Sequence, residues 1–262
     1  MKKQRESAHQ FLIDSWKSVS NAHLKIIEKD DFSLLQSNVS DFYLNAVLSF
    51  PQLNDMNLKK IALLNDFFQY NHKKKQNVAL WIKKEEFTAY RPFINGFENF
   101  GEVKTLTLDL QHFSEHVESS EKVVTQVNTS KDLKLWVSLF QDAFQLSKAG
   151  ESLFFSLFFD NLGNKKLKHF YLSTDAHICA ALTILENDKN EIYLCNFATK
   201  LEYRNKGLLT SLLSQVLTKE QKKGIKRVYV HANSLSSGLL NKMKFTQIDG
   251  YYFLGVLNHT MQ

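Results

Sequence analysis

A short polar loop between two apolar segments is the most informative stretch of this sequence. It reads Ala198-Thr199-Lys200-Leu201-Glu202-Tyr203-Arg204-Asn205-Lys206-Gly207-Leu208-Leu209-Thr210. Residues 191–198 before it have the composition of a buried strand. Residues 207–222 show the three-to-four spacing of leucine and valine that is typical of an amphipathic helix. The stretch therefore predicts a strand, a turn and a helix that begins at Gly207.

The beginning of that helix predicts an anion-binding site. The first backbone N–H groups of a helix have no partner inside the helix, and the positive end of the helix dipole lies behind them. Such a corner suits phosphate groups, here a diphosphate. Gly207 has no Cβ, so a phosphate can approach the backbone closely at this position.

The second half of the chain places further strands and helices around this loop. Their order predicts an α/β fold built on one mixed sheet. The expected strands are 123–127, 169–172, 178–184, 191–198, 228–231 and 251–257, and the expected helices are 132–144, 207–222 and 239–244.

The first half of the chain is less regular. Apolar residues recur at helical spacing around positions 42–47 and 61–68, so about the first sixty residues are expected to be helical. Strands are expected at 78–82 and 103–108, with a helix at 84–95 that ends at Gly96. A polar, acidic stretch at 114–120 is the expected linker, which gives domains 1–118 and 119–262. The two halves echo each other weakly, and a degenerate duplication is one hypothesis.

Charge and motif content narrow the class of protein. The net charge is +6 and the sequence pI is about 9.1, which suits a nucleic acid or a polyanionic cofactor as partner. No stacking aromatics interleave with the lysine runs at 72–75 and 165–168, so nucleic-acid binding is not expected. No Ser/His/Asp spacing, HExxH or Walker-type loop occurs, which disfavours hydrolase and nucleotide-triphosphatase functions.

The cysteines and apolar runs indicate a reduced, cytoplasmic protein. Cys179 and Cys195 lie in apolar runs without a CxxC or cysteine–histidine cluster, so no metal site is expected. The longest apolar stretch, 153–159, is far shorter than the ~20 residues of a membrane span and is expected to be buried. The charged N-terminus lacks an uninterrupted apolar segment, so a signal peptide is not expected.

The loop also resembles a known family signature. Arg204-x-x-Gly207 after a strand is similar to Gln/Arg-x-x-Gly-x-Gly/Ala, the pyrophosphate signature of the GNAT (GCN5-related N-acetyltransferase) family. The resemblance extends from His169 to Leu257, and the first half resembles more weakly the motif-poor half of bacterial two-domain GNAT proteins. It implies a mixed, mostly antiparallel GNAT-type sheet flanked by helices, preceded by a degenerate GNAT-like α/β half.

The resemblance implies that acetyl-CoA lies between two splayed parallel strands. In the family, the strand before the loop offers backbone groups to the thioester and pantetheine, and the loop amides hold the pyrophosphate. A polar residue after the next strand often contacts the pantetheine arm. By this match the donor-binding residues are Phe197, Ala198, Thr199, Arg204, Asn205, Lys206, Gly207, Leu208, Leu209, Thr210 and Asn233.

The resemblance also implies a catalytic base. Histone-type members place a glutamate at a fixed distance before the signature arginine, and Glu191 lies at that distance, thirteen positions before Arg204. A glutamate at the start of a strand can instead be a solvated turn residue, and His231, Tyr229 and Tyr193 are alternative bases.

Three positions depart from the family pattern. Leu209 stands where the signature has Gly or Ala, and its side chain either crowds the phosphates or turns aside. Leu240 stands where many members have a tyrosine that protonates the leaving thiolate, and Lys244 replaces the glycine that usually precedes Phe245. These departures leave both donor binding and turnover open.

The function expected from the resemblance is N-acetyl transfer from acetyl-CoA to a primary amine of a small molecule or peptide. The alternatives are a catalytically weak GNAT-fold module that binds CoA or a protein partner, and a transferase for a longer acyl donor. An amine acceptor is the expected partner, without nucleic acid, membrane or metal. The sequence leaves the acceptor undefined and a homodimer open.

Overall fold

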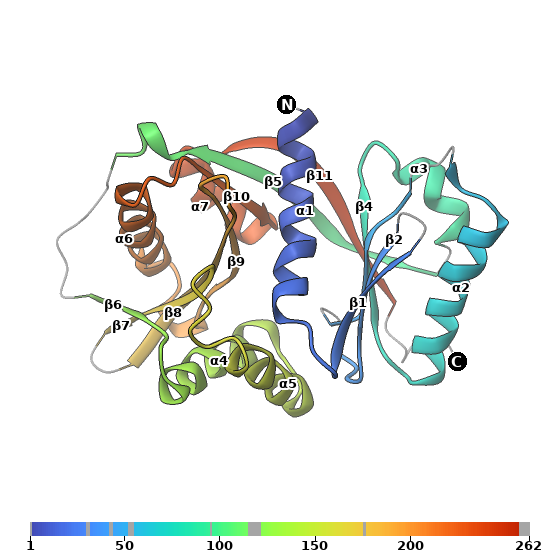
Figure 1. Cartoon of the computed structure of the whole chain (residues 1–262), viewed down its shortest axis with the longest axis horizontal. Coiled ribbons are helices and arrows are strands. Elements are labelled where there is room, and N and C mark those ends of the chain that lie inside the picture. The colour runs from blue at the N-terminus through green and yellow to red at the C-terminus, as the bar shows by residue number, and fades with distance from the viewer. Residues whose placement is uncertain are drawn as a thin grey trace. The chain divides into compact units, whose positions relative to one another are not determined.

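The chain forms two compact units, which we call the large unit and the small unit. The computed structural model describes residues 2–29, 32–41, 44–51, 55–94, 96–114, 122–174 and 177–256 (Figure 1). The large unit comprises Met1–Val19, Thr105–Ala232 and Ser236–Ile248, and the small unit comprises Ser20–Lys104, Asn233–Leu235 and Asp249–Gln262. Each unit is therefore assembled from segments that are far apart in the sequence.

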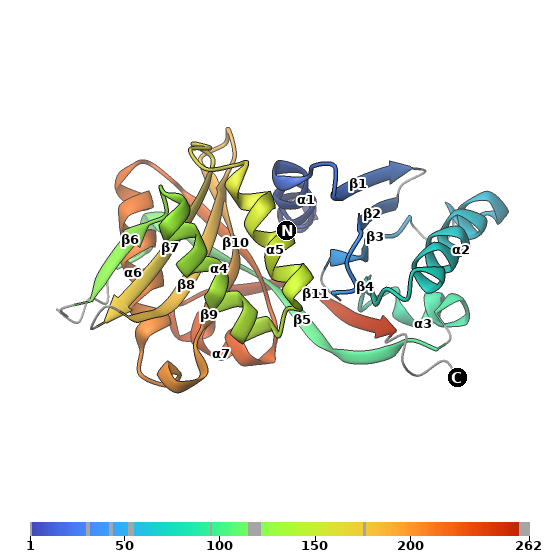
Figure 2. The same ribbon diagram turned by 90° about the horizontal axis from the view of Figure 1, so that it is seen from below.

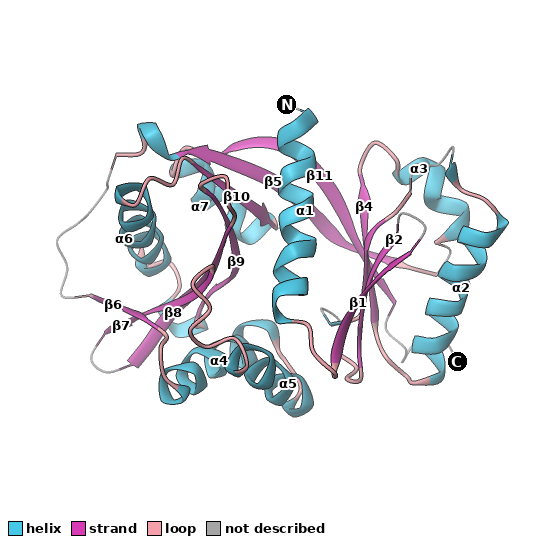
Figure 3. Cartoon of the chain, viewed as in Figure 1, coloured by secondary structure: helices cyan, strands magenta, loops and turns pink. Residues whose placement is uncertain are grey.

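The large unit is built on a mixed sheet with the strand order β11-β5-β10-β9-β8-β7-β6 (Figure 3). The strands from β6 to β9 pair antiparallel, whereas β9 and β10 are parallel. β5 and β11 contribute residues to both units. The elements are α1 (Lys2–Val19), β5 (Glu98–Asp109), η4 (Leu110–His112), β6 (Val123–Gln126), α4 (Ser130–Phe144), α5 (Lys148–Phe159), β7 (Leu167–Thr174), β8 (His177–Glu186), β9 (Glu191–Thr199), η5 (Leu201–Tyr203), α6 (Leu208–Lys222), β10 (Arg227–Ala232), α7 (Ser234–Lys242) and β11 (Thr246–Val256).

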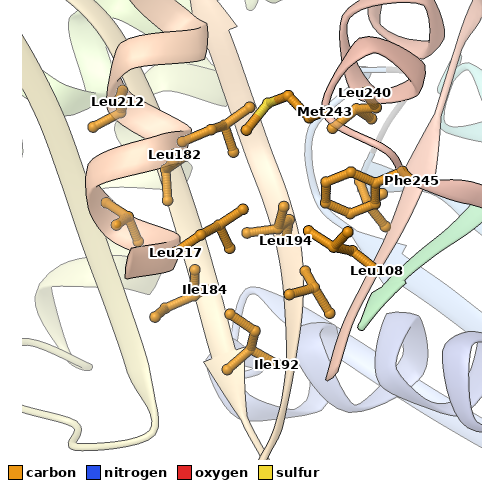
Figure 4. Packing of buried hydrophobic residues seen from close by; sticks show 14 of the residues in the cluster. Leu108, Leu182, Ile184, Ile192, Leu194, Leu212, Leu217, Leu240, Met243 and Phe245 are labelled. Carbon is orange, nitrogen blue, oxygen red and sulfur yellow. The ribbon is translucent and has the colours of Figure 1, made fainter. Parts of the chain in front are cut away.

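One face of this sheet carries the main apolar core, and α6 and α7 pack on it (Figure 4). Leu212 and Leu217 of α6 are fully buried there, which confirms the leucine stripe expected from the sequence. Ile192 and Leu194 of β9 belong to the same core. Because side chains alternate along a strand, Tyr193 between them faces the other side of the sheet.

Helices α1, α4 and α5 supply aromatic contacts on that other side. Phe11 of α1 stacks on Tyr193, with ring centroids 6.0 Å apart. Trp136 of α4 is fully buried, and its indole N–H donates to the carbonyl oxygen of Leu182 at 3.4 Å. Phe158 of α5 lies 5.1 Å from the Trp136 ring, so the phenylalanine-rich segment 153–159 contributes to the core as expected.

The small unit has the strand order β1-β2-β3-β4-β11 (Figure 2). All these pairs are antiparallel except β3–β4, which is parallel. Its core is formed by buried residues of these strands together with Leu64 and Phe67 of α2. The elements are β1 (Leu24–Lys29), β2 (Phe32–Ser37), β3 (Ala46–Ser49), α2 (Leu58–Lys73), β4 (Val78–Lys83), α3 (Phe87–Tyr90) and η3 (Arg91–Phe93), followed by the segments of β5 and β11 in this unit.

Both units contain a parallel strand–helix–strand unit. In the small unit it is β3-α2-β4, and in the large unit it is β9-α6-β10. The strand before each of these units pairs antiparallel with its first strand. This shared arrangement supports the hypothesis of a duplication.

The expectation of an all-helical beginning was wrong. α1 ends at Val19, and three strands follow before α2. Ala46 and Val47 lie in β3 and are both buried, at 2% and 0% exposure. A strand buried on both faces is apolar at consecutive positions, so spacing alone does not separate it from a buried helix.

The expected helix at 84–95 is also shorter than the sequence suggested. The described part consists of α3 and the 3-10 turn η3, with Pro92 in the first turn of η3. Proline lacks a backbone N–H, which limits it to such terminal positions. The last strand, in turn, begins at Thr246, five residues before the predicted start at 251.

The expected linker at 114–120 and the boundary at 118/119 lie outside the described residues, apart from Ser114. The compact units differ from the two sequence halves at both ends, because α1 groups with the large unit and the end of β11 with the small unit. None of the helices in the described ranges is long and apolar enough to cross a membrane.

Candidate functional site

The parallel strands β9 and β10 part before either strand ends. Their register runs from Glu191–Arg227 to Leu194–Val230. β9 continues to Thr199 and β10 to Ala232. We call the last pair, Leu194–Val230, the branch point. Beyond it, the backbone groups on the β10 side of residues 195–199 lie outside the β9–β10 ladder.

A β-bulge in β9 accompanies this parting. Thr183 of β8 pairs with Cys195, but Ala181 pairs with Ala198. Asn196 and Phe197 together therefore oppose the single residue Leu182. Asn196 has a positive φ of 45°, a conformation that asparagine adopts more readily than most residues. Bulges bend and twist a strand, which accounts for the divergence of β9 from β10.

The loop after β9 leads to a helix without a side-chain cap. Arg204 holds the loop, since its Nε donates to the carbonyl oxygen of Thr199 at 3.2 Å. Gly207 is the N-cap of α6 with a φ of 70°, and no side-chain cap occurs there. No heavy atom lies within 4 Å of the position that a Cβ would take at Gly207. The first amides of α6 therefore face an open corner that fits a phosphate group.

The electrostatic surroundings of this corner suit an anion. Arg204 and Lys206 are exposed, and Lys200 is half-buried. The Lys206 ammonium lies 5.3 Å from the centroid of the Tyr203 ring, a cation–π distance. Glu202 is the only carboxylate among the loop residues 200–206. The loop thus carries a net positive charge in addition to the helix dipole.

Leu208 and Leu209 do not obstruct the corner. Leu208 is 6% exposed within the main core, and Leu209 packs against the same core. Of the two outcomes expected for Leu209, the structure shows the one in which the side chain turns aside. Thr210 follows in the first turn of α6 and is half-buried.

The remaining donor-site candidates lie at the ends of the two parallel strands. Phe197 packs partly against the core, Ala198 is buried and Thr199 is half-buried. Asn205 is exposed in the loop and has a positive φ of 60°. Asn233 follows β10 directly, and its side-chain oxygen accepts a hydrogen bond from the backbone N–H of Leu235 at 3.1 Å, at the start of α7.

Glu191, the expected base, lies at the paired end of β9. Its carboxylate accepts hydrogen bonds from the Asn187 amide at 3.1 Å and the Tyr229 hydroxyl at 3.3 Å, and Arg227 approaches it to 4.0 Å. The branch point is three residues further along the strand, about 10 Å at the usual rise. These contacts favour a structural role, and the catalytic role of Glu191 stays a prediction.

The structure brings together two of the alternative bases, Tyr193 and His231. The Tyr193 hydroxyl and the His231 Nδ1 are 2.9 Å apart. Burial, helped by His9, lowers the pKa of His231 to about 3, so the ring is neutral at physiological pH. Tyr229, the third alternative, is bonded to Glu191 instead.

The cysteine next to the branch point carries a thiol that is not activated. Burial raises the pKa of the Cys195 thiol to about 12, so the nucleophilic thiolate does not form at neutral pH. The described residues contain no group of three or more His, Cys, Asp or Glu arranged to hold a metal ion.

Sequence reasoning found the loop and helix but missed the bulge and the role of α1. The bulge depends on which residues of β8 face β9, and that pairing leaves only a weak local signal in Asn196. α1 reaches the sheet from the start of the chain and contacts it through Phe11. No spacing rule connects residue 11 with residue 193.

Comparisons with known proteins agree with this geometry. Residues 133–245 match the model of the acetyltransferase (GNAT) family. A GCN5-related N-acetyltransferase from Kribbella flavida has a similar structure, with a TM-score of 0.68, 9% identity and 95% of each chain covered. A tandem GNAT protein from the clavulanic acid biosynthesis pathway gives 0.62 at 10% identity, covering 97% of this chain and 95% of that one. A search of curated protein sequences finds no match. At these identities the structural similarity speaks for the fold alone.

Proposed function

We propose that the large unit transfers an acetyl group from acetyl-CoA to a primary amine of a small molecule or peptide, because residues 133–245 match the model of the acetyltransferase (GNAT) family. The observation that carries the proposal is the parting of β9 and β10 directly before the uncapped N-terminus of α6. A cytoplasmic location and a homodimer stay predictions.

The α6 corner supports binding of the CoA diphosphate. Amides of the first helical turn and the loop from Arg204 to Thr210 supply donors, while Arg204 and Lys206 supply positive charge. The open space at Gly207 lets the diphosphate reach the backbone. These features support the proposal that the loop and the first turn of α6 form the pyrophosphate subsite.

The parted strands support binding of the pantetheine arm and the thioester. Residues 197–199 offer backbone N–H and C=O groups that the β9–β10 ladder does not use. The arm is itself an amide chain, so it can pair with such a strand edge much as another strand would. Asn233 follows β10 directly in the chain, and the family resemblance makes it the proposed polar contact to the arm.

The reaction requires positioning more than strong acid–base chemistry. The amine nitrogen attacks the acetyl carbonyl carbon, the carbon–sulfur bond breaks and its electron pair stays on sulfur, while the amine loses one proton. A site that aligns the amine and the thioester supplies much of the rate enhancement. Backbone N–H groups beyond the branch point are candidate donors to the carbonyl oxygen as it gains charge.

One observation favours the alternative of a CoA-binding module with weak turnover. Leu240 is fully buried in the main core, so residue 240 offers no proton donor to the leaving sulfur. This alternative has the same donor site and differs only in chemistry. Binding and turnover therefore have to be measured separately.

Isothermal titration with acetyl-CoA tests donor binding. We expect binding at micromolar to submillimolar ligand, and no heat at millimolar ligand would refute the donor site. A second assay follows release of free CoA thiol with a panel of small amines and peptides. Thiol release with at least one amine supports the transferase, whereas binding without release supports the alternative.

A further inference from the structure

Two tyrosines lie side by side on β9 and β10, and their hydroxyls point to different ends of the strands. Tyr193 and Tyr229 are paired in the parallel register. The Tyr229 hydroxyl donates to Glu191, at the paired end. The Tyr193 hydroxyl bonds to His231, the first residue of β10 after the branch point. Tyr193 therefore places its hydroxyl where the strands begin to part.

The packing around Tyr193 fixes that position. Its ring is 2% exposed and stacks on Phe11 of α1 at an interplanar angle of 13°. His9 of α1 meets the His231 ring edge-on at 6.5 Å. Cys195 and His231 are the next residues on this face of β9 and β10, and they follow the last paired residues of the two strands. The hydroxyl thus lies beside a packed aromatic cluster, at the level where the β9–β10 pairing ends.

We infer that Tyr193 donates the proton to the departing CoA sulfur and that His231 is the positioning residue that holds the Tyr193 hydroxyl at the branch point. This inference rests on the proposed function, because it requires the thioester to lie between the parted strands. Proton donation to the leaving sulfur would then come from Tyr193 of β9. Leu240 of α7 is a buried leucine and has no proton to donate.

The proton balance of the step is simple. As the amine nitrogen bonds to the acetyl carbon, the carbon–sulfur bond breaks and sulfur takes its electron pair. The Tyr193 O–H proton moves to sulfur, and the tyrosinate oxygen takes up the proton that the amine nitrogen loses. The products are the amide and the CoA thiol, and Tyr193 returns to its starting form.

The chemical properties of the two groups match these roles. A phenol with an ordinary pKa of about 10 is close enough to a thiol of about 8.5 to exchange a proton efficiently. His231 stays neutral because burial lowers its pKa to about 3, so it orients the phenol without carrying charge.

A binding experiment tests the contact without knowledge of the acceptor. CoA and desulfo-CoA, which lacks the sulfur, are titrated into the full-length protein at about pH 9, where an ordinary thiol is largely ionised. A hydrogen bond from Tyr193 to sulfur makes the wild type prefer CoA by about threefold to tenfold. Tyr193→Phe abolishes the preference. Tyr171→Phe is the matched control, since it removes a hydroxyl bonded to Asp132 in the same unit and leaves the preference intact.

The outcomes separate the inference from the proposed function. If neither CoA nor desulfo-CoA binds, the donor site and the inference are both refuted. Binding of both with equal affinity by the wild type, or a preference that survives Tyr193→Phe, overturns the inference and leaves donor binding standing. If Tyr193→Phe does not fold, His231→Asn replaces it, because releasing the hydroxyl should reduce the preference; an unchanged preference then overturns the proposal.

Turnover gives a second readout once an accepted amine is found. Tyr193→Phe should lower kcat by about 100-fold to 10,000-fold, the range for general acid–base groups, with KM for acetyl-CoA nearly unchanged. His231→Asn should lower kcat less. Equal loss in Tyr171→Phe would show a structural effect and contradict the assignment.

Discussion

Helices α2 and α6 hold equivalent places in the two units, but they begin in different ways. Each connects two parallel strands of its sheet. α2 is capped by Asn57, whose side-chain oxygen accepts a hydrogen bond from the Lys60 N–H at 3.0 Å. α6 begins at Gly207 without a side-chain cap. The same architecture thus satisfies an amide at one helix and leaves the corresponding corner open at the other.

The segments at the ends of β3 and β9 show a similar difference between the two units. In the small unit, Phe50 follows β3 and packs 5.0 Å from the ring of Tyr90 and 5.9 Å from that of Phe32. Tyr90 is fully buried, and its hydroxyl donates to the carbonyl oxygen of Pro51. In the large unit, the residues of β9 past the branch point lie outside the β9–β10 ladder. Aromatic packing after β3 therefore stabilises the small unit, whereas the corresponding part of β9 is the proposed ligand-binding edge.

This difference indicates how one fold can serve stability in one place and ligand binding in another. Caps and aromatic packing each contribute to stability, and a glycine N-cap such as Gly207 gives up only a few tenths of a kcal/mol relative to asparagine. Sites that bind ligands commonly accept such local losses. The small unit, on this comparison, is expected to contribute no second acetyl-CoA site.

The largest expected effect comes from closing the α6 corner. Gly207→Glu places a carboxylate among the phosphates, where like charge costs several kcal/mol, so acetyl-CoA should bind at least about 100-fold more weakly. Gly224→Glu at the other end of α6 is the control, since Gly224 also has a positive φ of 93° and open space around it. Titration calorimetry of both variants checks this. Equal affinity in Gly207→Glu and Gly224→Glu would break the comparison.

The sequence was sufficient for the elements around this corner because their patterns are local. The leucine spacing of α6, the alternation in β5 and the glycine at 207 each predict structure within a few residues. The branch point was not predictable in the same way. It depends on a bulge at Asn196 and on the register between β8 and β9, which bring together residues far apart in the sequence.

Two further features could not be predicted from the sequence for the same reason. One is the grouping of α1 with the large unit, and the other is the presence of strands at the start of the small unit. Ala46 and Val47 are buried because of neighbours on β2 and β4, and their own spacing does not reveal this. For the site, the loop residues could be named from the sequence. The Tyr193–His231 pair could not, because it joins two strands across 38 positions of the chain.

Acid should affect the large unit through two buried histidines, His169 and His231. Burial lowers the pKa of His169 to about 3 from its ordinary value of 6.5. The unfolded chain therefore takes up a proton between pH 6.5 and 3 that the folded chain does not bind, so stability is full above pH 6.5 and is lost as the pH falls. In this pH range, His169→Phe should therefore take up about one proton fewer on unfolding than the wild type.

Urea unfolding from pH 7 to pH 4 measures this effect. His169→Phe should be less stable at pH 7 by about 1–3 kcal/mol, because it leaves the buried Thr183 hydroxyl without its bond to His169. The difference from the wild type should then narrow as the pH falls. A constant difference between His169→Phe and the wild type over this pH range would contradict the assignment.

Removing the α2 cap sharpens the comparison between the two helix starts. Asn57→Ala leaves the Lys60 N–H without its side-chain acceptor and should lower the free energy of unfolding by about 1 kcal/mol. Acetyl-CoA affinity should not change, because the open corner belongs to α6. Thermal unfolding and calorimetry on the same sample check both statements. A second molecule of acetyl-CoA bound by Asn57→Ala would show that the cap alone separates the two helices.

The smallest expected effect concerns Lys244, which stands where the family usually has glycine. Lys244 is exposed and has a φ of 70°. Its backbone therefore lies in the left-handed region, which costs a residue with a side chain about 1–2 kcal/mol. Lys244→Gly relieves that strain but restores unfolded-state freedom worth about 0.5–1 kcal/mol, leaving a net stabilisation of a few tenths to about 1 kcal/mol. Gly224→Lys, the reverse change at the end of α6, should destabilise by a similar amount, as urea unfolding would show. Acetyl-CoA affinity should be the same in Lys244→Gly and the wild type. A changed affinity would mean that the turn after α7 takes part in donor binding. The difference between the starts of α2 and α6 would then not be the whole reason why only the large unit binds acetyl-CoA.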